Sequence, residues 1–216
     1  MGVQQRAEEL AERLFLGGPV KHFAAVGRNQ LAVLLHNGLD PESRVLDVGC
    51  GALRGGYWIM RFLNRGNYFG IEPAKSMLQA GLDGIIEPDV LARAQPTFDH
   101  NDRFDFTVFG TTFDFVVARS IWTHASKAQI VAMLDSFVAT RTNNAVFLAS
   151  LLPVTDERPD YHGDEWVGRS HESDSGGTVA HDPAWIEAAC AERGLTVAES
   201  DPNVLHQHWL AIRAVG

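Results

Sequence analysis

The sequence predicts a doubly wound α/β fold, with a seven-stranded sheet that is mostly parallel and ends in an antiparallel C-terminal hairpin. Three observations lead to it. Short apolar runs alternate with helical stretches, which is typical of strand–helix units in a parallel sheet. A glycine turn, Gly49-Cys50-Gly51, directly follows the first apolar run. The last two apolar runs have no helical stretch between them, so the final strand is expected to return antiparallel.

The elements are expected in the order in which their patterns occur. Ala7, Leu10, Ala11 and Leu14 recur at helical spacing before Gly17, so a helix leads into a turn. The further helices are expected at 25–35, 56–63, 75–82, 85–94 (despite Pro88), 127–139 and 183–193. The strands are expected at 44–49, 68–72, 97–99, 113–118, 145–151, 195–198 and 208–213, with the turn-rich 199–203 before the last of them.

Composition restricts the classes of function. A chain of 216 residues that is 45% hydrophobic buries one sizeable core, so one domain is expected. A net charge of -9 without a Lys/Arg-rich run disfavours nucleic acid as a partner. No apolar stretch reaches the roughly 18 residues of a membrane helix, and Glu8, Glu9 and Glu12 stand where a signal peptide would be apolar, so a cytoplasmic location is expected. The pattern leaves the oligomeric state open.

A glycine turn and an acidic strand end mark the expected ligand site. Open parallel sheets bind ligands at the carboxyl ends of their strands, where the strand order reverses. The glycines of Gly49-Cys50-Gly51 let the backbone turn sharply and approach a ligand closely. About 20 residues later Glu72 ends the second strand, where its carboxylate can accept hydrogen bonds from both ribose hydroxyls of an adenosine.

Two cofactor classes share this geometry, and two residues separate them. The dinucleotide pattern G-x-G-x-x-G needs a third glycine where this chain has Arg54. Asp47, just ahead of the glycines, would repel a pyrophosphate but suits a ligand with an ammonium and a sulfonium. The loop therefore favours a cationic, phosphate-free nucleoside over a nicotinamide dinucleotide.

Two segments, 45–51 (VLDVGCG) and 68–73 (YFGIEP), resemble the first two motifs of class I S-adenosylmethionine-dependent methyltransferases. The stretches 49–56 and 113–124 are similar to a bacterial branch of that superfamily. The resemblance spans residues 26–152 and implies a Rossmann-like methyltransferase fold that binds S-adenosylmethionine. These motifs are specific for fold and cofactor and nearly silent on the methyl acceptor.

The resemblance also implies roles for single residues. The residues implied at the cofactor are Asp47, Gly49 and Gly51 at the methionine moiety; Glu72 at the ribose; Pro73, which adjoins Glu72; Asn101 or Asp102 at the adenine edge, with Phe104 stacking nearby; Arg119 and Ser120 after the fourth strand; and Arg28 or Gln30, in competition with Arg54, at the methionine carboxylate. Cys50 is expected to be a packing residue, because no neighbouring base marks it as a nucleophile.

The single domain is expected to have four parts: an N-terminal helical cap (1–40), a cofactor-binding core (41–152), a substrate lid or loop (153–182), and a closing helix and hairpin (183–216). A polar connection as long as 153–182 is typical of lids and binding loops. The candidate acceptor contacts are Trp122, Thr123, Tyr161, His162, Trp166 and Arg169. The spacing of His162, Asp164, His171 and His181 matches no metal site, so no metal is expected.

His124 is the candidate acid-base residue, because it follows the fourth strand and an imidazole can take a proton near neutral pH. Two structural interpretations remain open: His124 caps the helix that starts near Ser126, or it packs beneath Trp122. Proximity of the acceptor to the sulfonium can also suffice without a base.

These observations predict an enzyme that transfers a methyl group from S-adenosylmethionine to a hydroxyl, amine or carboxylate of a small metabolite by in-line displacement. Residues 118–121 lack the Asn/Asp-Pro-Pro-Tyr signature of enzymes that methylate nitrogen in DNA bases or protein amides, which disfavours a macromolecular acceptor. The alternatives are a non-catalytic nucleoside-binding or partner-binding module with the same fold and a nicotinamide oxidoreductase, which the missing third glycine disfavours.

Overall fold

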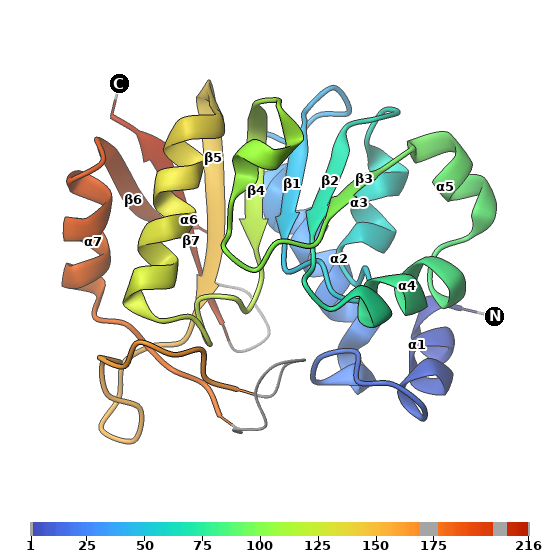
Figure 1. Ribbon diagram of the computed structural model, residues 1–216, viewed down its shortest axis with the longest axis horizontal. Helices are drawn as coiled ribbons and strands as arrows, with labels where there is room; N and C mark the ends of the chain where they lie inside the picture. The colour runs from blue at the N-terminus through green and yellow to red at the C-terminus, as the bar shows by residue number, and fades with distance from the viewer. Residues whose placement is uncertain (1, 169–176, 201–206, 216) are drawn as a thin grey trace. The chain divides into compact units, whose positions relative to one another are not determined.

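The computed structural model describes residues 2–168, 177–200 and 207–215. Its helices and strands alternate along the chain (Figure 1). The strands form a seven-stranded sheet in the order β3-β2-β1-β4-β5-β7-β6. The predicted fold class is therefore confirmed. The residues group into two compact units, Met1–Asp102 and Arg103–Gly216, and each is described by itself.

The first unit combines three parallel strands with most of the helices. Its strands are β1 (Val45–Val48), β2 (Tyr68–Ile71) and β3 (Thr97–Asp99), and their register pairs Val45 with Tyr68 and Ile71 with Asp99. Its helices are α1 (Val3–Ala11), the 3-10 turn η1 (Val20–His22), α2 (Phe23–His36), α3 (Gly56–Phe62), α4 (Lys75–Gly84) and α5 (Pro88–Ala94). All four residues of β1 are buried, as expected for a central strand.

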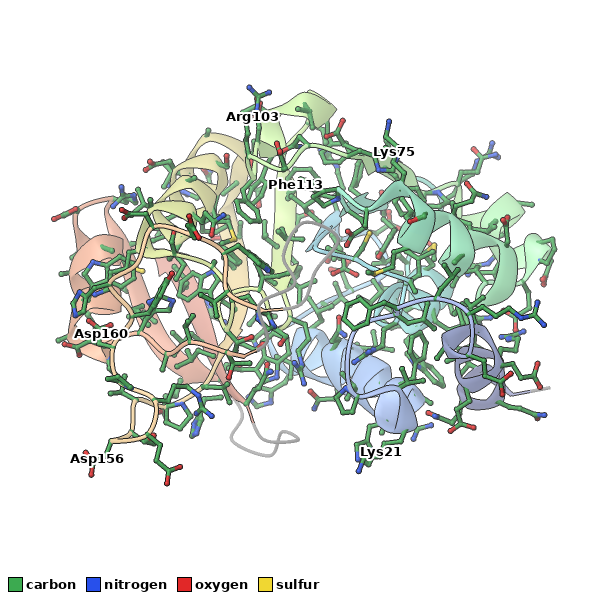
Figure 2. The ribbon with its side chains drawn as sticks, turned by 60° about the horizontal axis from the view of Figure 1, so that its bottom comes forward. Lys21, Lys75, Arg103, Phe113, Asp156 and Asp160 are labelled. Atoms are coloured by element: carbon green, nitrogen blue, oxygen red, sulfur yellow. The ribbon has the colours of Figure 1, made fainter. Side chains whose placement is uncertain are left out.

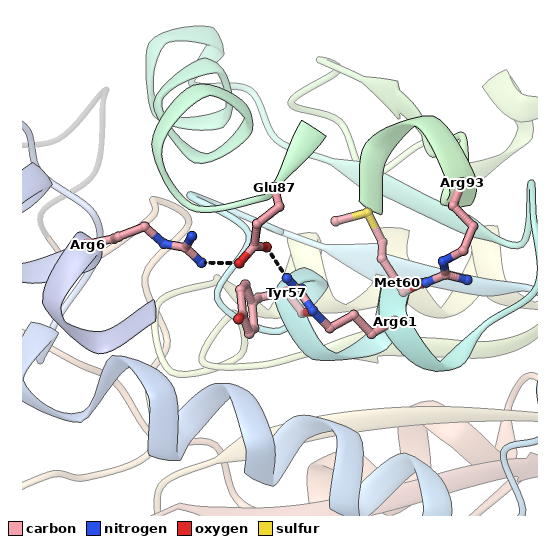
Figure 3. Close-up of polar contacts among 6 residues, drawn as sticks. All are labelled: Arg6, Tyr57, Met60, Arg61, Glu87 and Arg93. Atoms are coloured by element: carbon pink, nitrogen blue, oxygen red, sulfur yellow. Dashed lines mark hydrogen bonds and ion pairs between the residues drawn. The ribbon is translucent and has the colours of Figure 1, made fainter. Parts of the chain in front are cut away.

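Helix α5 begins at Pro88, so the predicted helix 85–94 is too long at its start. The reason is that proline has a preset φ and no N–H to lose, which suits the first helical position. Glu87, just outside the helix, accepts a bond from Arg6 of α1 at 2.7 Å and another from Arg61 of α3 (Figure 3). Both guanidinium groups also lie over the ring of Tyr57. These contacts join α1, α3 and the start of α5.

The second unit contains parallel and antiparallel pairs. Its strands are β4 (Phe113–Ala118), β5 (Arg141–Leu151), β6 (Leu195–Ser200) and β7 (His208–Ala214). Its helices are α6 (Lys127–Thr140), α7 (Pro183–Ala191) and the 3-10 turn η2 (Phe106–Phe109). Strand β4 is parallel to β5, whereas β7 is antiparallel to both β5 and β6. The antiparallel C-terminal hairpin is thus confirmed.

Strands β5 and β6 of the second unit exceed their predicted lengths by more than one residue. Strand β5 begins at Arg141 rather than at 145, because Arg141 pairs with Phe113 although the segment is polar. The next pair is Val146 with Phe115, so β5 bulges between the two pairs. Strand β6 continues to Ser200, so the predicted turn starts inside the strand, and residues 201–206 lie outside the described part of the chain.

Burial separates core from surface in both units. Phe113, at the start of β4, is fully buried, whereas Lys75 and Arg103 project outward (Figure 2). Trp122 and Phe147 are also fully buried and meet edge to face, with ring centroids 5.9 Å apart. Within the residues described, no helix is both long and apolar enough to span a bilayer.

Candidate functional site

The glycine turn of the first unit is fixed to the end of β2. The N–H groups of Gly49 and Cys50 both donate to the Ile71 carbonyl, at 2.8 and 3.1 Å. Gly49 and Gly51 have φ values of 68° and 53°, in the left-handed region that favours glycine. The backbone from 49 to 51 therefore turns directly beside the residue that precedes Glu72.

Glu72 lies against this turn with its carboxylate oriented by backbone donors. One oxygen accepts from the Gly51 N–H and the other from the Ala74 N–H, both at 2.9 Å. The side chain is buried, and Pro73 follows it at the start of the turn into α4, where its carbonyl accepts from Lys75. A carboxylate has about four acceptor positions, so two backbone donors are compatible with two ribose hydroxyls.

Asp47 is a second buried carboxyl group beside the glycine turn. Its Oδ2 accepts from the Tyr68 hydroxyl at 2.7 Å. Burial raises the pKa of Asp47 to about 7, the Tyr68 bond opposes that rise, and the charge of Glu72 adds to it. Burial and these two carboxylates also raise the pKa of the Cys50 thiol well above its ordinary value. Cys50 is thus a protonated thiol in a packed position, unsuited to nucleophilic attack.

Three candidates for the methionine carboxylate are in different surroundings. The Arg54 guanidinium donates to the carbonyls of Leu16, Gly17 and Gly18 and lies 5.1 Å from the ring of Phe23, so it holds the chain between α1 and α2. Burial lowers its pKa to about 10. Arg28 is exposed, over the ring of Trp58. Gln30 is buried against Gly55, where an added Cβ would clash with the Oε1 atom of Gln30.

His100, which directly follows β3, contacts Glu72 and was not among the predicted site residues. The Nδ1 atom of His100 lies 2.7 Å from the Glu72 carbonyl oxygen. Asn101 donates its backbone N–H and its side-chain amide to Asp99, at 2.8 and 2.6 Å. Asp102 is exposed at the end of the first unit. Phe104 belongs to the second unit and has a φ of 56°.

In the second unit, the predicted residues after β4 belong to a polar network. Arg119 Nη1 donates to Gln207 Oε1 at 2.6 Å, and Ser150 Oγ donates to the same oxygen at 2.6 Å. Ser120 donates its N–H to Ser150 Oγ at 2.7 Å, and its own hydroxyl accepts from Gln207 Nε2 at 3.0 Å. Gln207 thus joins the ends of β4 and β5 to the start of β7. Nothing in its local sequence indicated this role.

Ser120 has a φ of 60°, which is unusual for a residue other than glycine. Its hydroxyl lies 2.9 Å from that of Thr123, which donates to the Ser120 carbonyl at 3.0 Å. After this turn the side chains of Trp122 and Thr123 are fully buried. The structure therefore places both of these candidate acceptor contacts in the core, because the left-handed turn directs the chain inward.

His124 is held by the segment that follows β5. Its Nδ1 lies 2.7 Å from the Val167 carbonyl, and its ring stacks on Trp166 with centroids 5.4 Å apart. Burial lowers the pKa of His124, while bonds to the backbone of Val167 and Gly177 act in the opposite direction. The helix cap at this point is Ser126, which accepts from the Gln129 N–H, so the interpretation of His124 as the cap is wrong. Its stacking partner is Trp166 rather than Trp122.

The other candidate acceptor contacts lie farther along the same segment. Tyr161 donates its hydroxyl to the Glu165 carbonyl at 3.0 Å. The side chain of His162 is 77% exposed and lies 3.1 Å from Asp160, which is also paired with Lys127 at 2.6 Å. Arg169 lies outside the described residues. Among the residues described, no group of three or more histidine, cysteine or acidic side chains is placed to hold a metal.

With this geometry, the chain is similar to solved methyltransferase structures. No family model matches the sequence, and no curated protein matches it. A magnesium protoporphyrin IX methyltransferase from Synechocystis with bound S-adenosylhomocysteine is 18% identical, with 97% of this chain and 93% of that chain covered and a TM-score of 0.61. DesVI from Streptomyces venezuelae is 19% identical, with coverages of 96% and 98% and a TM-score of 0.64.

A third neighbour is the sugar N-methyltransferase KedS8 from a Streptoalloteichus species, which is 18% identical, with coverages of 96% and 93% and a TM-score of 0.61. At these identities the likeness establishes the fold. The chain therefore has the Rossmann-like fold of class I methyltransferases, over almost its full length.

Proposed function

We propose that this protein transfers a methyl group from S-adenosylmethionine to a hydroxyl, amine or carboxylate of a small metabolite. The observation that carries the proposal is the buried Glu72 carboxylate, oriented at the glycine turn by the N–H groups of Gly51 and Ala74. The fold adds support, since neighbours that share it were crystallised with S-adenosylmethionine or S-adenosylhomocysteine. The residues that we propose at the cofactor are those implied by the resemblance of the sequence to methyltransferase motifs.

The charges of the first unit suit this cofactor. Asp47 and Glu72 present two acidic groups beside the turn, and a cation with an ammonium and a sulfonium relieves their mutual repulsion. A phosphate-bearing nucleotide would add to that repulsion. Glu72 would accept the ribose hydroxyls, and Asp47 would attract the ammonium of the methionine moiety. With this cofactor, we also propose the four parts expected from the sequence: a helical cap, a cofactor-binding core, a substrate lid, and a closing helix and hairpin.

The reaction is an in-line displacement. A lone pair of the acceptor attacks the methyl carbon, the carbon–sulfur bond breaks, and its electron pair stays on sulfur to give S-adenosylhomocysteine. The protein chiefly aligns the acceptor with the sulfonium. A hydroxyl or ammonium acceptor must also lose one proton, and we propose His124 as its recipient. The lowered pKa of His124 keeps the imidazole neutral at pH 7 and able to accept a proton.

The contact with Val167 gives His124 a rival role as an anchor for residues 165–168. Two amide substitutions separate the roles. In His124→Asn the side-chain NH2 replaces Nδ1–H and keeps a donor toward Val167, whereas in His124→Gln the NH2 takes the position of Nε2. A base role predicts that kcat falls by about 10² to 10⁴ in both variants with unchanged cofactor affinity. An anchoring role predicts that His124→Asn retains turnover.

Calorimetry with S-adenosylhomocysteine, followed by turnover assays over hydroxyl, amine and carboxylate acceptors, tests the proposed function. We expect binding in the wild type and formation of S-adenosylhomocysteine with one acceptor class. Binding without turnover on any class would indicate a non-catalytic module. A rise in melting temperature with NAD(H) but not with S-adenosylmethionine would favour an oxidoreductase.

A further inference from the structure

The contact between Tyr68 and Asp47 is an internal feature of the first unit that neither the motifs nor the proposed chemistry requires. Tyr68 is the first residue of β2, and Asp47 is the third residue of β1. Val45 pairs with Tyr68, so Tyr68 and Asp47 lie on the same face of these strands, two residues apart in register. The tyrosine side chain runs along that face toward the glycine turn and ends at Asp47 Oδ2.

The surroundings of the Tyr68 hydroxyl make this contact specific. Tyr68 and Asp47 are 1% and 3% exposed, so water does not replace either partner. A Cβ added to Gly56, at the start of α3, would lie 2.7 Å from the Tyr68 hydroxyl oxygen. The absence of a side chain at Gly56 is therefore what gives the hydroxyl room. A phenol that served only as apolar packing would not need its polar end placed on a buried carboxyl group.

We propose that Tyr68 is a positioning residue for cofactor binding: its hydroxyl favours the ionised form of Asp47, whose other carboxylate oxygen receives the ammonium of the methionine moiety. The inference rests on the proposed function. The physical reason is that a buried carboxyl group favours its neutral form, and a donated hydrogen bond restores the charged form. Only the charged form attracts an ammonium by a full Coulomb interaction.

The other groups that act on Asp47 make this donor necessary. The titratable groups around it are Tyr68, Glu72 and Cys50. Glu72 opposes ionisation of Asp47 by its charge, and Cys50 is a neutral thiol. Burial also raises the pKa of Tyr68, so its hydroxyl keeps its proton and acts as a donor. Of the three, Tyr68 is the group that favours the carboxylate.

The test is the pH dependence of S-adenosylhomocysteine affinity in Tyr68→Phe. In the wild type, affinity should rise with pH through about 7, as Asp47 ionises, and fall again when the ligand's amino group loses its proton, at about pH 8 or above. Loss of the hydroxyl should move the rising limb to higher pH. A displacement of about one pH unit corresponds to about a fivefold weaker affinity at pH 7, where half of the wild-type Asp47 is ionised.

Three controls separate positioning from packing. Tyr57→Phe removes a hydroxyl elsewhere in the same unit, and Tyr57 contacts Arg6 and Arg61 through its ring, so its profile should match the wild type. Asp47→Asn keeps an acceptor for Tyr68 without the charge, so its profile should lose the rising limb. Methylthioadenosine, which has no amino acid group, should bind wild type and Tyr68→Phe equally.

The outcomes distinguish this inference from the proposed function. If the wild type binds neither S-adenosylmethionine nor S-adenosylhomocysteine, the proposed function fails. If the wild type binds and Tyr68→Phe has the same profile, or is weaker by one factor at every pH and for methylthioadenosine as well, Tyr68 is a packing residue and the inference is wrong. A displaced rising limb in Tyr68→Phe, absent in Asp47→Asn, supports it.

Discussion

The two units assemble their polar groups over different distances in sequence. In the first unit the bonds from Gly51 to Glu72 and from Tyr68 to Asp47 each span 21 residues, which is one strand–helix–strand step. In the second unit the bond from Arg119 to Gln207 spans 88 residues, and that from His124 to Val167 spans 43. Contacts between groups within one such step can be predicted from a sequence motif. Contacts between groups that distant segments bring together cannot.

The two sets of groups also differ in charge. The first unit buries two acidic side chains at its turn, Asp47 and Glu72, so this region gains from binding a cation. The network around Gln207 consists of hydroxyl and amide groups with one guanidinium, which are hydrogen-bonded to one another. We therefore expect substitutions at the first set to change cofactor affinity and the pH dependence of affinity and stability, and those at the second to change stability or turnover.

The largest effect is expected from Glu72→Ala. This change removes a charged acceptor for two hydroxyls, and each such hydrogen bond contributes roughly 1.5 to 3 kcal/mol. Calorimetry should show a dissociation constant for S-adenosylhomocysteine raised about a hundredfold or more. Glu87→Ala, which removes a carboxylate remote from the turn, should bind like the wild type. Unchanged affinity in a folded Glu72→Ala would exclude Glu72 from the site.

Asp47→Asn should stabilise the ligand-free protein, increasingly so at higher pH. Because the pKa of Asp47 is about 7 when folded against an ordinary 3.8, the folded chain binds more protons there, and its stability falls as the pH rises from about 4 to about 7. Asparagine has no such dependence. The advantage of Asp47→Asn should therefore grow by about 2 to 3 kcal/mol between pH 5 and pH 8.

Urea unfolding at the two pH values measures this change. Asp156→Asn, which removes an exposed carboxylate from the surface, is the matched control and should unfold like the wild type. An Asp47→Asn advantage of the same size at both pH values would mean that the carboxyl group is not held in the protonated form by burial.

The sequence predicted the seven strands and the glycine turn, because each depends on a short local pattern. The sequence could not predict where the Arg54 side chain lies. Its guanidinium donates to three carbonyls of the segment before α2, which are 36 to 38 residues away. Trp122 was one of the candidate acceptor contacts. In the structure it follows the left-handed Ser120 and its side chain is fully buried, a placement that no local pattern indicated.

Gln207→Leu tests the long-range network of the second unit. The substitution leaves the buried Ser150 hydroxyl without its acceptor and the Arg119 guanidinium without its amide partner. Unsatisfied buried groups cost about 1 to 3 kcal/mol each, so we expect a loss of about 2 kcal/mol in urea unfolding. Gln207→Glu keeps both acceptor bonds and should lose less. Equal losses in the two variants would show that side-chain packing, and not hydrogen bonding, holds this position.

The smallest effect is expected from Glu87→Gln. Glu87 takes part in a contact of the first unit that, unlike those at the glycine turn, joins distant segments. The bond from Arg6 to Glu87 spans 81 residues, so the first unit also contains a long-range contact. Partial burial raises the pKa of Glu87, but the bonds from Arg6 and its own backbone and the charges of both arginines outweigh it, so the pKa lies below its ordinary value. The stabilisation is therefore present above about pH 4.5 and is lost as the pH falls through the folded pKa.

The side chains of this cluster are 20 to 34% exposed, so solvent screens their charges. We expect Glu87→Gln to lower stability by about 0.5 to 1 kcal/mol in dilute buffer at pH 7, and by almost nothing in 1 M salt, where the Debye length is about 3 Å. Arg93→Met is the control, because Arg93 donates to the carbonyl of Met60 (Figure 3) and to that of Leu63 rather than to a carboxylate, so the loss of stability in this variant should persist in salt. If Glu87→Gln instead lost as much stability as Gln207→Leu, and the loss persisted in 1 M salt, contacts between distant segments would contribute as much to the stability of the first unit as to that of the second.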